Sequence, residues 1–324
     1  MNFKDYLEDI ASGVLRQTDY SKPGWLASTS RKFAEESNPN HSLEIPSRFL
    51  SIFEHRDAIE RVVSTLTSDN VSKSGVHRLP AWTLGWQENL EAFKLNPSKA
   101  ALVPGYFRPF SVQQYMGRWM KSETELGFEL DFLHSLINVV VHGVRYEFSF
   151  DTLIEFGCGT GHNLVSISEA FPSINLVGCD WAVSSQEILQ EIATQLKINV
   201  LGRHFDYFSP SLEVEPEFCA LTVASMEQLG EDHNKFLDFL ISKSPVCVVH
   251  FEPIGELLPS DELLGNISLE YFRKRNYLSG YLTKLIELEK RKKVEIIAAE
   301  RTGFGSFFIE GYSLVIWKPI KAKG

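Results

Sequence analysis

Three glycines at alternate positions follow an acidic residue near the middle of this chain. The segment reads LIEFGCGTGHN over residues 153–163. Its apolar start predicts a buried parallel strand, the glycines predict a tight turn, and the polar end is suited to cap a helix. A ligand can approach the backbone of such a turn closely and bind its free N–H groups. The segment therefore predicts a ligand-binding strand–turn–helix unit.

A second acid lies at the distance that a nucleotide site requires. The apolar run 176–179 ends at Asp180, 23 residues beyond Gly157. In nucleotide-binding βαβ units, an acid at about this distance accepts hydrogen bonds from ribose hydroxyls. We therefore expect Asp180 to hold the sugar of the ligand.

The spacing of the glycines discriminates between two cofactor classes. The dinucleotide fingerprint places its third glycine three positions after the second, where this chain has His162. The pattern here is acid-x-Gly-x-Gly-x-Gly, which resembles the first motif of the class I S-adenosylmethionine-dependent methyltransferases. A nicotinamide enzyme and a glycine-rich turn in an unrelated α/β domain are the alternatives. The resemblance implies S-adenosyl-L-methionine as cofactor, held at Glu155, Gly157, Cys158, Gly159, Gly161, Asn163 and Asp180.

The second half of the chain alternates short apolar runs with longer helical stretches, which predicts a doubly wound parallel sheet. We expect strands at 152–156, 175–179, 199–204, 218–224 and 246–250, and helices at 163–171, 184–196, 232–242 and 268–292. Two β-rich runs, 294–300 and 312–317, close the chain. This count resembles the seven-stranded, mostly parallel α/β sheet of the class I methyltransferases, whose last strand is inserted antiparallel. The resemblance covers about residues 150–324 and not the first hundred.

The first half of the chain is predicted to be helical. Apolar residues recur at helical spacing over 3–10 and 49–66, and these stripes need a surface to cover. Loops are expected at 37–42 and 68–75, and one helix is expected over 122–144, with Ser122 and Glu125 as a capping box. We expect a helical cap over residues 1–105 and a Rossmann-like, cofactor-binding catalytic domain over 106–324.

The segment 104–119 mixes aromatic residues, arginines and turn residues without a period. One interpretation is a linker that its aromatic side chains anchor to the core. The other is a loop on the substrate side, in which Tyr115 or Arg118 holds the cofactor's carboxylate or an acidic substrate.

Further site residues are expected where strands end, because ligands of open α/β sheets bind outside the carboxyl ends of the strands. After the third strand, the resemblance assigns the adenine amino group to Asp206, which could instead be a turn acid. Trp181 and Phe205 are the candidates for stacking on the ring. Residues 224–229 resemble the family's fourth motif, so Ala224 is expected beside the methyl donor.

Three titratable residues are the candidate catalytic groups. Glu227 follows the fourth strand, and His250 and Glu252 lie at the end of the fifth. His250 is the best candidate for a general base, because its unperturbed pKa is near neutral. Acceptor specificity is expected from the cap and from the late helix, whose candidates are Tyr271, Phe272, Arg275, Asn276 and Tyr277.

Composition narrows the class of acceptor. The net charge is −10 and the isoelectric point about 5.5, which argues against a broad phosphate-binding surface. The first twenty residues lack a signal-peptide core, no apolar run approaches a membrane span, and the four cysteines form no close metal-ligand pair. We therefore expect a cytoplasmic methyltransferase acting on an O or N atom of a small molecule, with no metal, nucleic acid or membrane partner. The alternatives are a protein or RNA methyltransferase, which a basic surface stripe around residues 273–275 and 291–293 would support, and a cofactor-binding protein without catalysis. The oligomeric state is left open.

Overall fold

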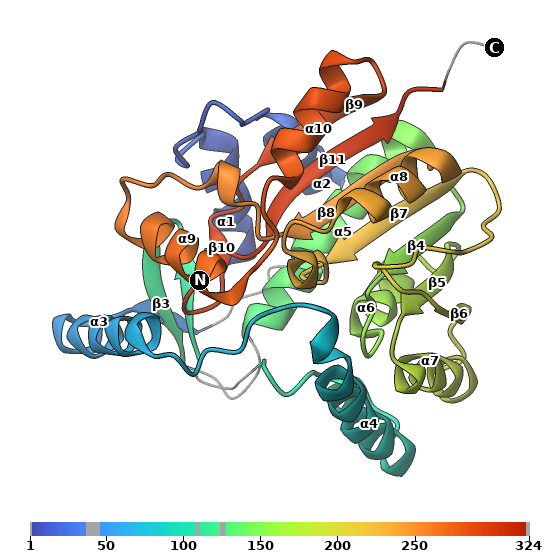
Figure 1. Ribbon diagram of the computed structural model, residues 1–324, viewed down its shortest axis with the longest axis horizontal. Coiled ribbons are helices and arrows are strands. Elements are labelled where there is room, and N and C mark those ends of the chain that lie inside the picture. The colour runs from blue at the N-terminus through green and yellow to red at the C-terminus, as the bar shows by residue number, and fades with distance from the viewer. Residues whose placement is uncertain (1, 37–45, 108–110, 124–127, 322–324) are drawn as a thin grey trace.

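A seven-stranded sheet forms the centre of the molecule (Figure 1). The computed structural model describes residues 2–36, 46–107, 111–123 and 128–321. The strand order is β6-β5-β4-β7-β8-β11-β9, and all neighbouring strands pair in parallel except β11, which is antiparallel to β8 on one side and to β9 on the other. This is the predicted class I methyltransferase arrangement, and the predicted fold class is confirmed. The strands are β4 (Thr152–Phe156), β5 (Asn175–Asp180), β6 (Val200–His204), β7 (Phe218–Val223), β8 (Cys247–Glu252), β9 (Val294–Glu300) and β11 (Ser313–Pro319).

Helices cover both faces of this sheet, which explains why its central strands are nearly continuous apolar runs. Side chains of α5, α6 and α7 belong to one hydrophobic cluster, and those of α8 and α10 belong to another on the opposite face. All four cysteines are buried and free. The helices that flank the sheet are α5 (Phe128–Phe148), α6 (His162–Ala170), α7 (Val183–Gln195), α8 (Asn234–Lys243) and α10 (Tyr281–Lys290). The side chains of α9 (Leu263–Arg275) pack in separate, smaller hydrophobic clusters.

Two predicted helices are corrected by the structure. Ser122 ends a strand and pairs with Ser47, so the helix expected over 122–144 instead begins at Phe128. Glu125, its expected capping partner, lies outside the described residues. The helix expected over 268–292 is two helices, because Asn276 takes a left-handed conformation (φ 55°) that ends α9.

A second sheet, which the sequence did not predict, lies beside the first. Its order is β1-β3-β2-β10, and all its pairs are antiparallel. Met116 and Gly117, both with positive φ, turn the chain between β2 and β3. Residues 112–119 of the segment interpreted as a linker or a loop therefore belong to a hairpin. The strands are β1 (Ser47–Phe49), β2 (Val112–Tyr115), β3 (Arg118–Ser122) and β10 (Phe304–Gly305).

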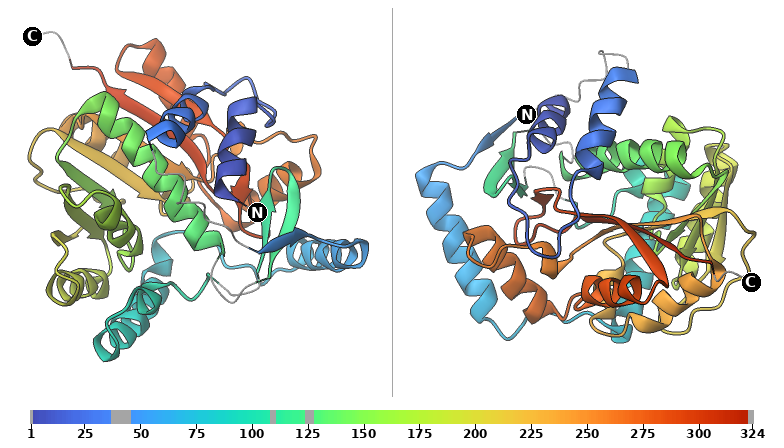
Figure 2. Two further views of the ribbon diagram at one scale, coloured as in Figure 1. Left: turned by 180° about the vertical axis from the view of Figure 1, so that it is seen from behind. Right: turned by 90° about the horizontal axis from the view of Figure 1, so that it is seen from above.

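The N-terminal helices contact several different parts of the molecule (Figure 2). α1 and α2 pack together, and α2 contacts α5 and β9, while α3 contacts α9 and α4 contacts α7. The apolar stripe expected over 49–66 is only partly right, because Val62 is buried while Ile52 and Phe53 are exposed. Among the described residues, none of the helices has the length and apolar character needed to cross a bilayer. These helices are α1 (Phe3–Ser12), α2 (Trp25–Glu36), α3 (Ile52–Thr67) and α4 (Leu79–Leu95).

Candidate functional site

The glycine-rich turn follows β4 as predicted, and its backbone requires glycine. Gly157, Gly159 and Gly161 have φ values of 74°, 54° and 74°, in the left-handed region that other residues rarely adopt. A Cβ atom on Gly157 would lie 2.4 Å from Cβ of Ser225, in the turn that follows β7. Two strand ends therefore meet at Gly157 with no room for a side chain.

Asp180 connects this turn to the end of β5. Its carboxylate accepts hydrogen bonds from the N–H of Gly159 at 3.0 Å and of Ala182 at 2.9 Å. Burial raises the pKa of Asp180 to about 6, although these backbone bonds act in the opposite direction. Each carboxylate oxygen keeps a lone pair for a further donor.

The turn and Asp180 line a narrow cavity, called the first cavity below. The structure brings most of the predicted cofactor residues to its wall. Trp82 and Trp86 of α4, with Pro104 and Tyr106 further along the chain, form part of the opposite side. The predicted residues that line the first cavity are Gly157, Cys158, Gly159, Asn163, Asp180, Trp181, Phe205 and Ala224.

Three other predicted cofactor residues lie next to the wall. Glu155 is buried behind it and accepts a hydrogen bond from the side-chain amide of Asn163 at 2.7 Å, so it positions that residue. Gly161 precedes α6 as its N-cap. Asp206 accepts a hydrogen bond from the N–H of Phe208 at 2.8 Å and does not line the first cavity. Its position is that of the turn acid, which was the alternative interpretation.

Tyr115 and Arg118 belong to the hairpin sheet and line neither cavity described here. Tyr115 is buried, with its ring centroid 6.2 Å from that of Tyr6. The guanidinium of Arg118 lies 3.6 Å from the ring centroid of Phe49. Neither side chain lines the cavity at the glycine-rich loop, which contradicts the prediction that either holds a carboxylate there.

A larger cavity, called the second cavity below, adjoins the first. Its volume is about 440 Å³, within the range of roughly 300–1,000 Å³ that is usual for small-molecule sites. Its polar wall includes Arg78, Glu129, Glu227, Arg275 and Tyr277. Of the predicted acceptor-side residues, Glu227, Arg275 and Tyr277 are therefore brought together. Six residues line both cavities, namely Trp82, Tyr106, His162, Asn163, Val223 and Ala224.

The two carboxyl groups of the second cavity have raised pKa values. Burial, and then the negative charge of Glu252, raise the pKa of Glu227 to about 8, against the opposing effect of Arg275. Burial raises the pKa of Glu129 to about 7, and this carboxylate accepts a hydrogen bond from the Tyr312 hydroxyl at 2.9 Å. Both groups can exchange a proton near neutral pH.

His250 does not reach either cavity. It is fully buried in β8, with Nδ1 2.8 Å from the Thr222 hydroxyl. Its Nε2 lies 2.7 Å from the Tyr281 hydroxyl and 3.0 Å from Nε1 of Trp317. Because side chains alternate along a strand, His250 points to the face of the sheet that α10 covers. The prediction that His250 is the general base is wrong.

Glu252 also stays within the protein. One carboxylate oxygen accepts hydrogen bonds from the N–H groups of Ser225 at 3.0 Å and Met226 at 3.1 Å. Glu252 lines neither cavity, so it holds the turn after β7 and does not meet a ligand. Its predicted catalytic role is replaced by this positioning role.

Several lining residues were missed by the sequence analysis. His162 was noted only as the residue that replaces a glycine, yet it lines both cavities, with Nδ1 2.9 Å from Nε2 of His134. Trp82 and Trp86 are spaced i, i+4 on α4, which predicts a shared helix face but not its partner. Arg78 had no signal in the sequence.

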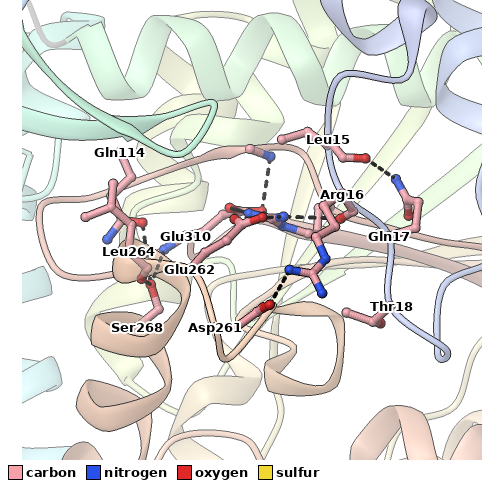
Figure 3. Close-up of polar contacts among 12 residues, drawn as sticks. Leu15, Arg16, Gln17, Thr18, Gln114, Asp261, Glu262, Leu264, Ser268 and Glu310 are labelled. Carbon is pink, nitrogen blue, oxygen red and sulfur yellow. Dashed lines mark hydrogen bonds and ion pairs between the residues drawn. The ribbon is translucent and has the colours of Figure 1, made fainter.

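The segment after β9 supplies the remaining wall of the second cavity through Ile309 and Tyr312. It is held by a buried pair in which Arg301 donates two hydrogen bonds to Glu310, at 3.0 and 2.7 Å. The surrounding contacts of Glu310 with Ser268, and of Arg16 with Asp261, are shown in Figure 3. A buried bidentate pair of this kind is geometrically specific, so it fixes the course of the segment.

Comparison with known proteins finds no protein family and no curated protein that matches this chain. Among solved structures, TnmH is 15% identical with a TM-score of 0.41, over 58% of each chain. The small RNA methyltransferase HEN1 is 17% identical with a TM-score of 0.43, over 56% of this chain and 25% of its own. The pyocyanin biosynthetic protein PhzM is 13% identical with a TM-score of 0.43, over 79% of this chain and 76% of its own. The strand order, and not these distant similarities, identifies the fold.

Proposed function

We propose that this protein is an S-adenosyl-L-methionine-dependent methyltransferase that methylates an O or N atom of a small molecule. The observation that carries the proposal is the junction of the two cavities. The glycine-rich turn and Asp180 build the first, and the larger second cavity shares with it His162, Asn163 and Ala224. A donor in one cavity and an acceptor in the other would meet at these residues.

Unpartnered polar atoms in the wall of the first cavity fit the proposed cofactor. Oδ1 of Asn163 and Oε1 of Gln228 are buried acceptors without a partner, and Nε1 of Trp82 is a buried donor without one. Buried polar groups usually have hydrogen-bond partners. Two acceptors suit the ammonium group of the methionine end, and one donor suits its carboxylate.

Other residues fit the nucleoside end of the cofactor. The free lone pairs of Asp180 would accept hydrogen bonds from the ribose hydroxyls. The rings of Trp181 and Phe208 are stacked at the cavity wall, with centroids 6.1 Å apart and planes at 27°. Their faces would pack against adenine.

When bound, the cofactor supplies an electrophilic methyl group, to which an acceptor lone pair bonds as the electrons of the carbon–sulfur bond move to sulfur. The protein's contribution is to hold donor and acceptor together, which can supply about 7–11 kcal/mol in well-oriented reactions. The proton of the acceptor would pass to Glu227, whose raised pKa suits a base near neutral pH. His162, at the junction, is the second candidate for this role.

The shape of the second cavity favours a small acceptor over a polymer. Its wall combines residues of α4, α5 and α9 with those of the segment after β9, which places them on several sides of the cavity. A protein or RNA methyltransferase would need an open surface at this place.

Calorimetric titration with S-adenosylmethionine, S-adenosylhomocysteine and NAD tests the proposal. We expect both sulfur compounds to bind with a stoichiometry of one and NAD not to bind. Asp180→Asn should weaken S-adenosylhomocysteine binding at least tenfold, because its amide N–H₂ opposes a backbone N–H and loses one acceptor. Asp238→Asn, on the exposed side of α8, is the matched control and should bind as the wild type does. The proposal is refuted if neither sulfur compound binds. It is also refuted if Asp180→Asn binds S-adenosylhomocysteine with the dissociation constant of the wild type.

A further inference from the structure

Two arginines line the second cavity without forming a close ion pair. Neither Arg78 nor Arg275 pairs directly with a carboxylate of the described residues, although Arg275 is hydrogen-bonded to Tyr277 and interacts electrostatically with Glu227. Nε of each guanidinium is buried and has no hydrogen-bond partner. Buried polar atoms usually have a hydrogen-bond partner. Each guanidinium therefore keeps a buried N–H available for a ligand in the cavity, and planar carboxylates are the anions that arginine binds best.

Local packing holds both guanidinium groups at the cavity. Arg78 lies 5.9 Å from the ring centroid of Trp82, and Arg275 lies 5.3 Å from that of Tyr277. The N–H of Ser74 donates a hydrogen bond to the carbonyl of Arg275 at 2.7 Å, which ties the segment before α4 to the end of α9. The two cations therefore come from adjoining segments of the same wall.

Aromatic rings make up much of the remaining surface. Tyr106 and Phe107 lie on the segment after α4, with ring centroids 4.7 Å apart. Tyr277 and Tyr312 line the same cavity from α9's end and from the segment after β9. Aromatic side chains bind flat rings by offset-stacked and edge-to-face contacts. The cavity is thus suited to a ligand that is itself planar.

The acidic residues of the cavity do not cancel the arginine charge at neutral pH. The pKa of Glu227 is raised to about 8 and that of Glu129 to about 7, in both cases mainly by burial. Near pH 7 a large fraction of each group is protonated and neutral. The two arginines therefore dominate the charge that a ligand meets.

We infer that the methyl acceptor is a small aromatic carboxylic acid. Its carboxylate would bind Arg78 and Arg275, its ring would lie between the aromatic walls, and its hydroxyl or amino group would lie at the junction near His162. This inference rests on the proposed function, because it identifies the second cavity as the acceptor site of a methyltransferase. The binding of the acid itself needs only the second cavity.

Titration of the protein saturated with S-adenosylhomocysteine tests the inference. The probes are 4-hydroxybenzoate, 4-aminobenzoate and 4-hydroxycinnamate, each compared with its neutral amide. We expect at least one acid to bind ten times or more tightly than its amide. Arg275→Gln and Arg78→Gln should each lower the affinity for that acid at least tenfold and leave its amide and S-adenosylhomocysteine unaffected.

Arg273→Gln is the matched control. Arg273 lies on the same helix, is exposed and pairs with Glu270, so its loss should not change binding of the acid. If S-adenosylhomocysteine binds but no acid is preferred over its amide, or the two variants bind the acid as the wild type does, the inference is wrong and the proposed function stands. If acids bind through the arginines but S-adenosylhomocysteine does not bind, the proposed function fails and the acceptor role fails with it.

Discussion

Gly157 and Ser225 occupy the point where the glycine-rich turn meets the turn after β7. The Ser225 hydroxyl donates a hydrogen bond to the carbonyl of Phe156 at 3.0 Å, and the Tyr207 hydroxyl donates to the same carbonyl at 2.6 Å. Glu252 holds the backbone N–H of Ser225. These bonds tie Ser225 to Phe156 and Glu252. The turn after β7 therefore has little freedom to move if residue 157 gains a side chain.

We predict that Gly157→Ala removes measurable S-adenosylhomocysteine binding. The added Cβ would meet Ser225 at 2.4 Å in a residue whose φ is 74°. Gly280→Ala separates the steric clash from the backbone strain. Gly280 has nearly the same φ, 73°, but open space around its Cβ position. Calorimetry and urea unfolding should show a cost of about 1–2 kcal/mol in stability for the control, with its ligand affinity intact. Equal affinities for the two variants would contradict this prediction.

At His250 the expected effect is on stability and not on ligand binding. His250→Phe removes the partner of the Thr222 and Tyr281 hydroxyls and of Nε1 of Trp317, at a cost of about 1–3 kcal/mol for each group left unsatisfied. Urea unfolding should show the loss, and calorimetry should show an S-adenosylhomocysteine dissociation constant within twofold of the wild type. In a double-mutant cycle, Thr222→Val should recover part of the loss. A strong loss of affinity with unchanged stability would place His250 at the site after all.

At the scale of elements, α4 is the N-terminal helix that takes part in the first cavity. It packs against α7, and the Thr83 carbonyl accepts a hydrogen bond from the Ser184 hydroxyl at 3.2 Å. The ring of Trp86 stacks on Trp82, with centroids 5.4 Å apart, and lies 3.0 Å from where a Cβ of Gly159 would be. α4 therefore covers the glycine-rich turn and belongs to the cofactor wall.

Trp86→Leu tests whether α4 contributes to cofactor affinity. The substitution keeps an apolar residue but removes the broad ring beside Gly159, so we expect S-adenosylhomocysteine to bind about tenfold more weakly, or about 1.4 kcal/mol. Leu84→Ala is the control, because Leu84 is 62% exposed on the same helix. Calorimetric titration with S-adenosylhomocysteine measures both affinities. Equal dissociation constants in Trp86→Leu and the wild type would exclude α4 from the site.

At the scale of the whole molecule, buried titratable groups set the pH dependence of stability. Burial is the main cause that raises the pKa of four glutamates to about 7 or 8, above the value near 4.3 of glutamate in an unfolded chain. Between the unfolded pKa near 4.3 and the raised folded pKa values, the folded protein holds more protons than the unfolded chain. Its stability therefore falls as pH rises through this range. The values are about 7 for Glu129 and Glu252 and about 8 for Glu155 and Glu227.

Buried histidines make the stability of the fold rise with pH, but only in the acidic range. The pKa of His134 is lowered to about 4 and that of His250 to about 3, in both cases chiefly by burial. Their unfolded values lie near 6.5, so the stability that they contribute is complete above that pH and is lost as pH falls. Between pH 6.5 and 8 the carboxyl groups therefore determine the slope.

We predict that the free energy of unfolding decreases from pH 6.5 to pH 8. Urea unfolding at several pH values in this window measures the slope. Glu227→Gln should make the slope shallower, because one of the titrating carboxyl groups is absent. A stability that is constant or increases over this window would contradict the prediction.

The sequence by itself determined the main sheet and the ligand-binding turn. Strands buried between two layers of helices are continuous apolar runs, and left-handed turns require glycine, so both are visible in local composition. The predicted strands 152–156, 175–179 and 218–224 differ by no more than one residue at either end from β4, β5 and β7. Asp180 could be found for the same reason, because it ends a recognisable strand.

Only the tertiary structure decided which side chains meet at the site. The direction in which His250 points depends on the register of β8, and a shift of one residue would reverse it. The placement of Trp86 over Gly159, and of Arg78 beside the end of α9, depends on contacts between residues that are far apart in the chain. Such contacts leave no periodic pattern in the sequence, because they depend on how complete elements pack and not on the local conformation of either segment.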